Sequence, residues 1–191
     1  RLHQEKLAIV DALGDRRSRA VTLGDIARIL TDQGEVDEAL RLHQEQIAVY
    51  EALGDRRERA VTLGDIANIW MRQGKLDDAM AVKDEELATY RALGDRYSEA
   101  ATHWEVAQIH FAREDIEQAL TALLAAYPLF LHLGRLDGIC IVGQTLGTLL
   151  CQAGLRDEGL PILERSRTGF LKLGQAQSAQ ECADLITRFT S

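Results

Sequence analysis

Apolar residues recur along this chain at spacings of three and four, the pattern expected of helices that bury one face. Over residues 56–73 the apolar stripe consists of Ala60, Leu63, Ile66, Ala67 and Trp70. Over residues 76–93 a second stripe consists of Leu76, Ala79, Met80, Leu87 and Tyr90. Gly74 and Gly94 follow the two stripes, and glycine tolerates the left-handed turn after a helix. Asp95 then offers a side-chain oxygen to cap the next helix. The pattern predicts paired helices joined by short turns.

The helix pair repeats with a period of 40 residues, without insertions or deletions. Residues 1–40 and 41–80 are identical at 26 of 40 positions, and the sequence Leu-Gly-Asp recurs at 13–15, 53–55 and 93–95. Self-similarity at such a period is the signature of a solenoid, in which each hairpin buries its apolar face against its neighbours. We therefore expect an all-α solenoid (α-solenoid) of ten helices in antiparallel pairs, forming a single array over residues 1–191. The expected segments are the second helix of a truncated repeat at 1–14, complete pairs at 15–54, 55–94, 95–134 and 135–174, and a final helix at 175–191.

Composition and charge argue against several classes of partner. The formal net charge is −8, whereas a nucleic-acid binder normally carries a basic surface, so no nucleic acid is expected. Three cysteines without short pair spacing predict reduced thiols in a cytoplasmic protein. No apolar run approaches the roughly 20 residues that span a membrane, so no membrane is expected either. Because the chain begins inside a repeat, without a polar capping helix, we expect more protein upstream.

These units resemble tetratricopeptide repeats over essentially the whole chain. The resemblance is carried by small residues that let paired helices approach closely and by turn glycines, which are Ala27, Ala67, Ala107 and Gly147, then Gly34, Gly74 and Gly154, then Ala39, Ala79 and Ala119. The unit departs from the family at the usual large aromatic, replaced by Leu23, Leu63, His103 and Gly143, and at Gly159, where alanine is usual. The 40-residue unit is similar to those of kinesin light chains and of the helical sensor arrays of bacterial signalling ATPases. The resemblance implies a right-handed superhelix that binds a partner or senses a signal beside an effector domain.

Motifs for catalysis, metal binding and cofactor binding are missing from the sequence. It contains no Gly-rich phosphate loop, HExxH, CxxC or nucleophile elbow, so we expect no enzyme, no metal and no cofactor. His43 is the main candidate for unusual chemistry, because it lies on the apolar stripe of its helix. One histidine per repeat cannot fill a metal's coordination sphere, so we expect a partly buried histidine bonded to a nearby carboxylate such as Glu45 or to a side chain of a neighbouring repeat. A pH switch or a metal ligand is the alternative. Acidic pairs such as Glu85-Glu86 are expected on solvated helix faces.

The family resemblance places the binding surface on the first helix of each pair, which lines a concave groove. It implies these partner-binding residues: Arg28, Asn68, Met71, Arg72, Trp104, Gln108, Phe111, Gln144 and Thr148. Met71, Trp104 and Phe111 are expected to serve either as interface anchors or as packing against the next repeat. Gly24 and Gly64, inside predicted helices, are expected either to allow close helix packing or to leave room for a ligand's backbone.

Residues 121–160 differ from the preceding repeat, because they contain five charged residues where residues 81–120 contain thirteen. Pro128 is expected to kink its helix or force a restart, and Pro161 to do the same or to mark a late helix start. A charge-poor segment indicates a covered surface, although a diverged terminal repeat would look the same. We expect a non-catalytic protein- or peptide-binding scaffold, the sensor or adaptor part of a larger bacterial signalling protein. The alternatives are a homo-oligomer formed through 121–160 and a regulatory array that gates an effector enzyme on the same chain.

Overall fold

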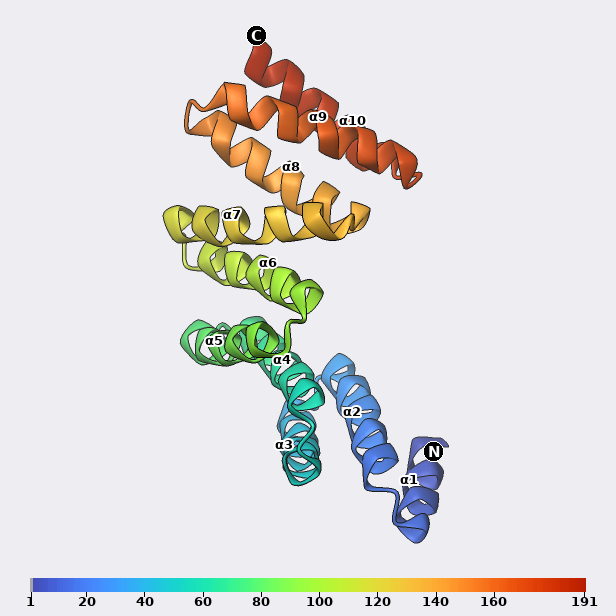
Figure 1. The fold of residues 1–191 in the computed structure, drawn as a ribbon. Coiled ribbons are helices and arrows are strands. Elements are labelled where there is room, and N and C mark those ends of the chain that lie inside the picture. The colour runs from blue at the N-terminus through green and yellow to red at the C-terminus, as the bar shows by residue number, and fades with distance from the viewer. Residues whose placement is uncertain (1) are drawn as a thin grey trace. The chain divides into compact units, whose positions relative to one another are not determined.

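The chain forms ten α-helices and no strand over residues 2–191, the part that the computed structural model describes (Figure 1). Turns of two or three residues join the helices. The helices are α1 (Leu2–Leu13), α2 (Arg16–Gln33), α3 (Val36–Leu53), α4 (Arg56–Arg72), α5 (Leu76–Leu93), α6 (Arg96–Ala112), α7 (Ile116–Leu133), α8 (Leu136–Gln152), α9 (Arg156–Lys172) and α10 (Ala176–Thr190).

Aspartate caps and left-handed residues stabilise these short turns. The Asp15, Asp55 and Asp95 side chains each accept a hydrogen bond of 3.0–3.2 Å from the backbone N–H three residues later, as predicted for Asp95. Gly54, with φ of 68°, ends α3 in the left-handed conformation, which costs glycine nothing. Glu114 adopts φ of 60° at the repeat position where other turns have glycine. Its Cβ makes that conformation costly, by about 1 kcal/mol.

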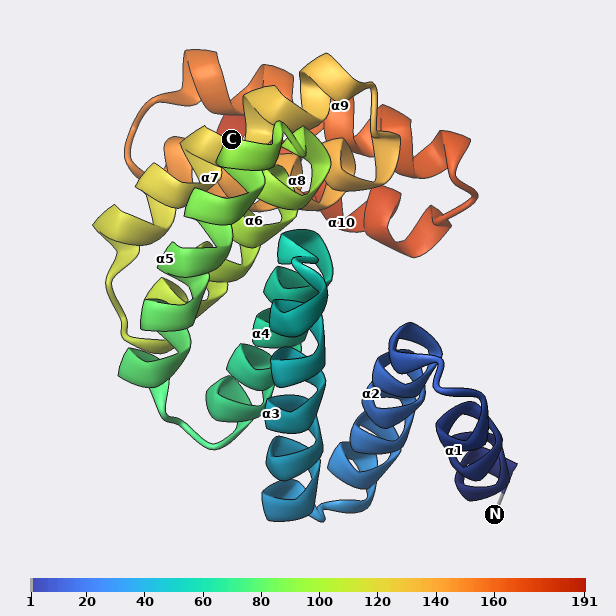
Figure 2. The same cartoon turned by 60° about the horizontal axis from the view of Figure 1, so that its bottom comes forward.

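The helices group into two compact units, residues 1–94 with α1 to α5 (unit 1) and residues 95–191 with α6 to α10 (unit 2). Within each unit every helix packs on the next helix along the chain (Figure 2). In addition α2 contacts α4 in unit 1, and α8 contacts α10 in unit 2. The first helices α2 and α4 therefore lie beside each other in unit 1, and α8 lies beside α10 in unit 2.

Small residues bring the paired helices close together. In unit 2, a Cβ added to Gly159 of α9 would lie 2.6 Å from the Gly147 carbonyl oxygen of α8. A Cβ added to Gly147 would lie 2.9 Å from the Gly159 carbonyl oxygen. The two backbones are in direct contact at this point, which explains why glycine stands at 159 in place of alanine. The corresponding pair in α6 and α7 is Ala107 and Ala119, and both are fully buried.

The two proline-containing helices are continuous. Helix α7 runs through Pro128 and helix α9 runs through Pro161, so the predicted restart at Pro128 and the late start at Pro161 are wrong. In α7 the burial of Tyr127 and Phe130 on either side of the proline offsets the lost backbone hydrogen bond. Among the described helices α7 alone is long and apolar enough to cross a membrane, a test that buried core helices also pass.

The predicted fold class, an all-α solenoid of paired helices, is confirmed. The boundaries predicted for individual repeats, their union into one array and the right-handed superhelix stay predictions. Residue 1 of the predicted segment 1–14 lies outside the described residues.

Candidate functional site

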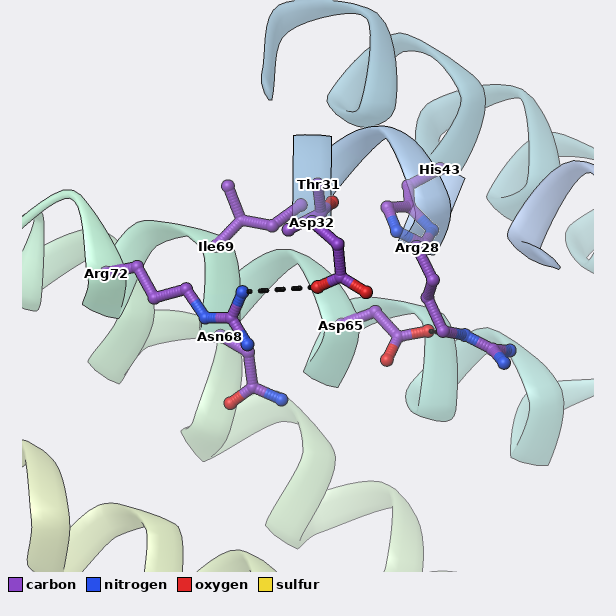
Figure 3. Close-up of a pocket in the computed structure, with 8 residues that line it drawn as sticks. All are labelled: Arg28, Thr31, Asp32, His43, Asp65, Asn68, Ile69 and Arg72. Carbon is purple, nitrogen blue, oxygen red and sulfur yellow. Dashed lines mark ion pairs between the residues drawn. The ribbon is translucent and has the colours of Figure 1, made fainter. Parts of the chain in front are cut away.

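A pocket of about 190 Å³ lies between the two first helices of unit 1, α2 and α4 (Figure 3). Three of the predicted groove residues, Arg28, Asn68 and Arg72, line it. Its other lining residues are Thr31, Asp32, His43, Asp65 and Ile69. The walls therefore come from α2 and α4, and His43 reaches the pocket from the second helix α3.

His43 forms the buried part of this pocket. Only 1% of its surface is exposed, and its Nδ1 lies 3.1 Å from Oε1 of Gln46, one turn along α3. Gln46 also donates to the hydroxyl of Tyr50, a hydrogen bond that works to lower the Tyr50 pKa. The Gln46 amide nitrogen thus faces Tyr50 and its oxygen faces His43. Because that oxygen only accepts hydrogen bonds, the proton of the neutral imidazole sits on Nδ1.

The second ring nitrogen of His43 is a buried acceptor. Its Nε2 makes no hydrogen bond with any of the described residues. Burial lowers the pKa of His43, against opposing contributions from the Gln46 hydrogen bond and from Asp65. The ring is therefore held neutral, with an Nε2 lone pair that needs a donor. The predicted bond to Glu45 is wrong, since Glu45 pairs with Arg19 across to α2 instead.

Glycine at position 24 explains why Gln46 fits inside the helix pair. A Cβ on Gly24 would lie 2.6 Å from Nε2 of Gln46, so the missing side chain makes room for the amide. The same device recurs one repeat later, where a Cβ on Gly64 would lie 2.6 Å from Oε1 of Glu86. Of the two roles expected for these glycines, the structure favours close packing, because both face the second helix and are buried.

Glu86 forms a buried ion pair with Lys83 at the position that His43 and Gln46 occupy in α3. The Lys83 Nζ lies 2.6 Å from Glu86 Oε2, and the two side chains are 1% and 5% exposed. The prediction that Glu86 lies on a solvated face is wrong. Its burial depends on Gly64, which comes from another helix and cannot be read from the local sequence of α5.

Two ion pairs cross the mouth of the unit 1 pocket in opposite senses. Arg28 of α2 approaches Asp65 of α4 at 3.5 Å, and Arg72 of α4 approaches Asp32 of α2 at 3.7 Å. Arg28 also lies 3.6 Å from Asp25 on its own helix. These distances exceed the 2.7–2.9 Å of a hydrogen-bonded ion pair. Both arginines are more than half exposed, so the pairs contribute little to stability and are easily exchanged for a ligand.

A second groove, of about 500 Å³, lies in unit 2 between the first helices α6 and α8 and the last helix α10. Three predicted residues line it, Phe111, Gln144 and Thr148. The other four lining residues, Thr145, Leu149, Gln152 and Leu185, were not predicted from the sequence. None of the seven carries a charge. The groove combines amide and hydroxyl groups with apolar side chains, which differs from the charged pocket of unit 1.

The remaining predicted residues lie on first helices but line neither of these two pockets. Met71 on α4, and Trp104 and Gln108 on α6, are partly exposed. Their contribution to binding stays a prediction.

The described residues contain no cluster of three or more potential metal ligands. The three cysteines are buried free thiols, and burial raises the pKa of Cys182 to about 11. A thiol with so high a pKa is a poor nucleophile near neutrality. The three thiols therefore act as core residues.

Comparison with known proteins supports a helical-repeat assignment. Residues 18–92 match the family model described as Tetratricopeptide repeat. No curated protein sequence matches the chain. The fold is similar to the crystal structure of BtubC (BKLC) from P. vanneervenii, with 17% identity and a TM-score of 0.67 over 99% of this chain and 70% of that one.

Two crystal structures of a putative kinesin light chain from Podosopora anserina, with nearly identical TPR-like repeats, are also similar. Both give a TM-score of 0.61 over 91% of this chain. The alignments cover 95% and 96% of the two solved chains, at 18% and 17% sequence identity respectively. At such identities the likeness shows the fold alone.

The helix pairs, their packing and these similarities define the chain as a helical-repeat protein of the α-solenoid class. The match of residues 18–92 to the tetratricopeptide repeat family model confirms the resemblance seen in the sequence. Tetratricopeptide repeats generally mediate protein–protein interaction or serve as scaffolds.

Proposed function

We propose that this chain is a non-catalytic scaffold that binds a peptide segment of a protein partner in the grooves between its first helices. The observation that carries the proposal is the uncharged groove of unit 2. Gln144 and Gln152 offer amide donors and acceptors, and Phe111 and Leu185 offer apolar contact area. An extended peptide presents main-chain N–H and C=O groups beside side chains, so it matches such a mixed lining.

Selection of displayed peptides on the full chain tests this proposal, with affinities measured by fluorescence anisotropy. Phe111→Ala and Gln144→Ala are each expected to weaken a selected peptide about tenfold, the loss typical of an interface residue worth about 1.4 kcal/mol. Gln118→Ala, which removes an exposed amide from the first turn of α7, is the control and should leave the affinity unchanged. Failure to select any peptide would contradict the proposal, and so would a peptide affinity that is unchanged in Phe111→Ala and Gln144→Ala.

We further propose that the scaffold is the sensor or adaptor part of a larger bacterial signalling protein that acts in the cytoplasm. The similarity of the 40-residue unit to helical sensor arrays supports this context. Mass spectrometry of the native protein tests it, since an effector domain on the same polypeptide is expected. If that effector is an enzyme, deletion of the array should change its basal rate, which would favour the gating alternative. A native polypeptide without an effector domain would overturn both.

Self-association is a second candidate function, and one observation favours it. The outer face of α7 carries Leu124, Pro128 and Leu131, and the two leucines are 49% and 37% exposed. At the corresponding positions α5 carries Asp84 and Arg91, so the apolar face is particular to α7. Light scattering across a concentration series tests this function. A dimer that Leu124→Asp dissociates would support it, and a monomer at every concentration would refute it.

A further inference from the structure

The strongest unexplained feature of unit 1 is the buried acceptor beneath its pocket. His43 Nε2 is enclosed and makes no hydrogen bond within the described part of the chain. In Figure 3 the imidazole of His43 points from α3 toward Asp65 and the stem of Arg28. A buried polar atom without a partner is costly, so a site that leaves one facing a pocket is adapted to a ligand that supplies the missing group.

The groups beside His43 are also acceptors. The Asp65 carboxylate has a loose contact of 3.5 Å with Arg28 and an electrostatic interaction with His43. The Thr31 hydroxyl donates its proton to the Ala27 carbonyl at 2.9 Å, which leaves its lone pairs free to accept. The inner pocket therefore presents an imidazole nitrogen, a carboxylate and a hydroxyl oxygen from three helices. The positively charged residues of the pocket are Arg28 and Arg72, which lie at its mouth and are more than half exposed.

We propose that this pocket binds the ammonium group of a lysine side chain carried by the partner peptide. An ammonium has three N–H donors and no acceptor, so it complements His43 Nε2, the Asp65 carboxylate and the Thr31 hydroxyl. Arg28 does not block this arrangement, because its long side chain is 57% exposed and keeps Asp25 as a partner when Asp65 turns to the ligand. The aliphatic stem of the lysine would lie along Ile69. A carboxylate in the same place would face lone pairs on every side.

This inference rests on the proposed scaffold function and specifies the partner for unit 1. It also gives His43 the role of a specificity residue. A partner segment with norleucine or glutamate in place of lysine would leave Nε2 without a donor. The cost of that unpaired atom would then discriminate between ligands.

The test uses the full chain and three small probes, the N-acetyl, N-methylamide derivatives of lysine, norleucine and glutamate. The measurement is the two-bond ¹H–¹⁵N spectrum of the histidine rings, in which His43 is assigned by its loss in a variant. We expect the lysine probe to shift the Nε2 resonance of His43 and to saturate at a Kd on the order of millimolar, as befits a single contact group. The norleucine probe, which has the same stem without the ammonium, should leave that resonance in place.

Variants locate the effect. Asp65→Asn should weaken the lysine probe about tenfold, because it removes the charge from one hydrogen bond. Asp84→Asn, on the exposed face of α5, is the matched control and should change nothing. The double variant His43→Leu with Gln46→Ala reproduces the pair Leu123 and Ala126 of α7, so it is expected to fold and to lose binding.

Three results would overturn the inference: equal shifts with norleucine, tighter binding of the glutamate probe at Arg28 and Arg72, or no shift with any probe at about 50 mM. Circular dichroism of each variant separates lost binding from lost folding. Peptides that bind through Phe111 and Gln144 while the lysine probe fails would leave the proposed scaffold function standing and remove only this inference.

Discussion

The glycine contact between α8 and α9 allows a prediction of both sign and size. The perturbation is Gly159→Ala, which adds one methyl group. The new carbon would lie 2.6 Å from the Gly147 carbonyl oxygen, 2.6 Å from Cys151 Sγ and 3.0 Å from the Cys151 backbone nitrogen. Two of these atoms belong to the backbone of α8, so no side-chain rotation relieves the overlap. The helices must separate by several tenths of an ångström.

Two opposing terms decide the result. Alanine is favoured over glycine inside a helix by about 1 kcal/mol. Overpacking a close-packed core costs about 1–3 kcal/mol, and a rigid backbone neighbour puts this site in the upper half of that range. We therefore expect a net destabilisation of about 1–2 kcal/mol. In a cooperative unit of about 100 residues, each kcal/mol of destabilisation lowers the Tm by roughly 4–8 °C.

Thermal and urea unfolding, followed by circular dichroism, measure this change. Thr168→Ala on the exposed face of the same helix is the matched control, since it changes helix propensity without touching α8. It should be neutral or slightly stabilising. A Gly159→Ala protein as stable as the wild type, or more stable, would refute the steric argument.

Three further changes test other parts of the structure by the same unfolding assays. Glu114→Gly should stabilise unit 2 by about 1 kcal/mol, because glycine adopts the positive φ of this turn without strain; an unchanged Tm would show that Glu114 is not strained. Lys83→Met should cost about 3–5 kcal/mol, since it leaves Glu86 buried without its cation, and combining it with Glu86→Leu should recover most of that loss; equal losses in both variants would contradict this. Burial lowers the pKa of His43 below 6.5, the value of an unfolded histidine. Below about pH 6.5 the unfolded chain therefore binds more protons than the folded chain, and the free energy of unfolding should fall as the pH drops. His43→Leu removes this part of the pH dependence, so parallel stability curves for variant and wild type between pH 7 and pH 5 would contradict the burial argument.

Local signals explain why much of the fold was predictable from the sequence. The predicted helix at 76–93 is α5, and the helix predicted at 56–73 ends one residue earlier as α4. These bounds follow from glycine and aspartate at fixed positions in each turn, and such signals act within four residues of the helix end. The restart predicted at Pro128 was wrong, because propensity measures the local cost of a residue and not the burial of Tyr127 and Phe130 that offsets it.

The candidate site depends on contacts that no local pattern reports. Arg28, Asn68 and Arg72 were placed in the groove by repeat position, and they line the unit 1 pocket. His43 belongs to a second helix, and its contact with the pocket depends on the spacing of α2 and α4. A sequence signal did exist in the pairing of Gly24 with Gln46. This pairing could be recognised only from the packed helices, in which the Gln46 amide lies against Gly24.

That pairing has a consequence for how such a chain changes in length. Gly24 and Gln46 both lie within residues 15–54, and Gly64 and Glu86 both lie within residues 55–94. A recombination event that inserts or removes 40 residues in this register moves each glycine together with the polar side chain it accommodates. Each 40-residue segment can thus be duplicated or deleted without separating a glycine from the side chain that packs on it. Duplication of residues 15–54 is expected to lengthen the chain with the same helicity per residue, and a loss of helical circular dichroism would contradict this.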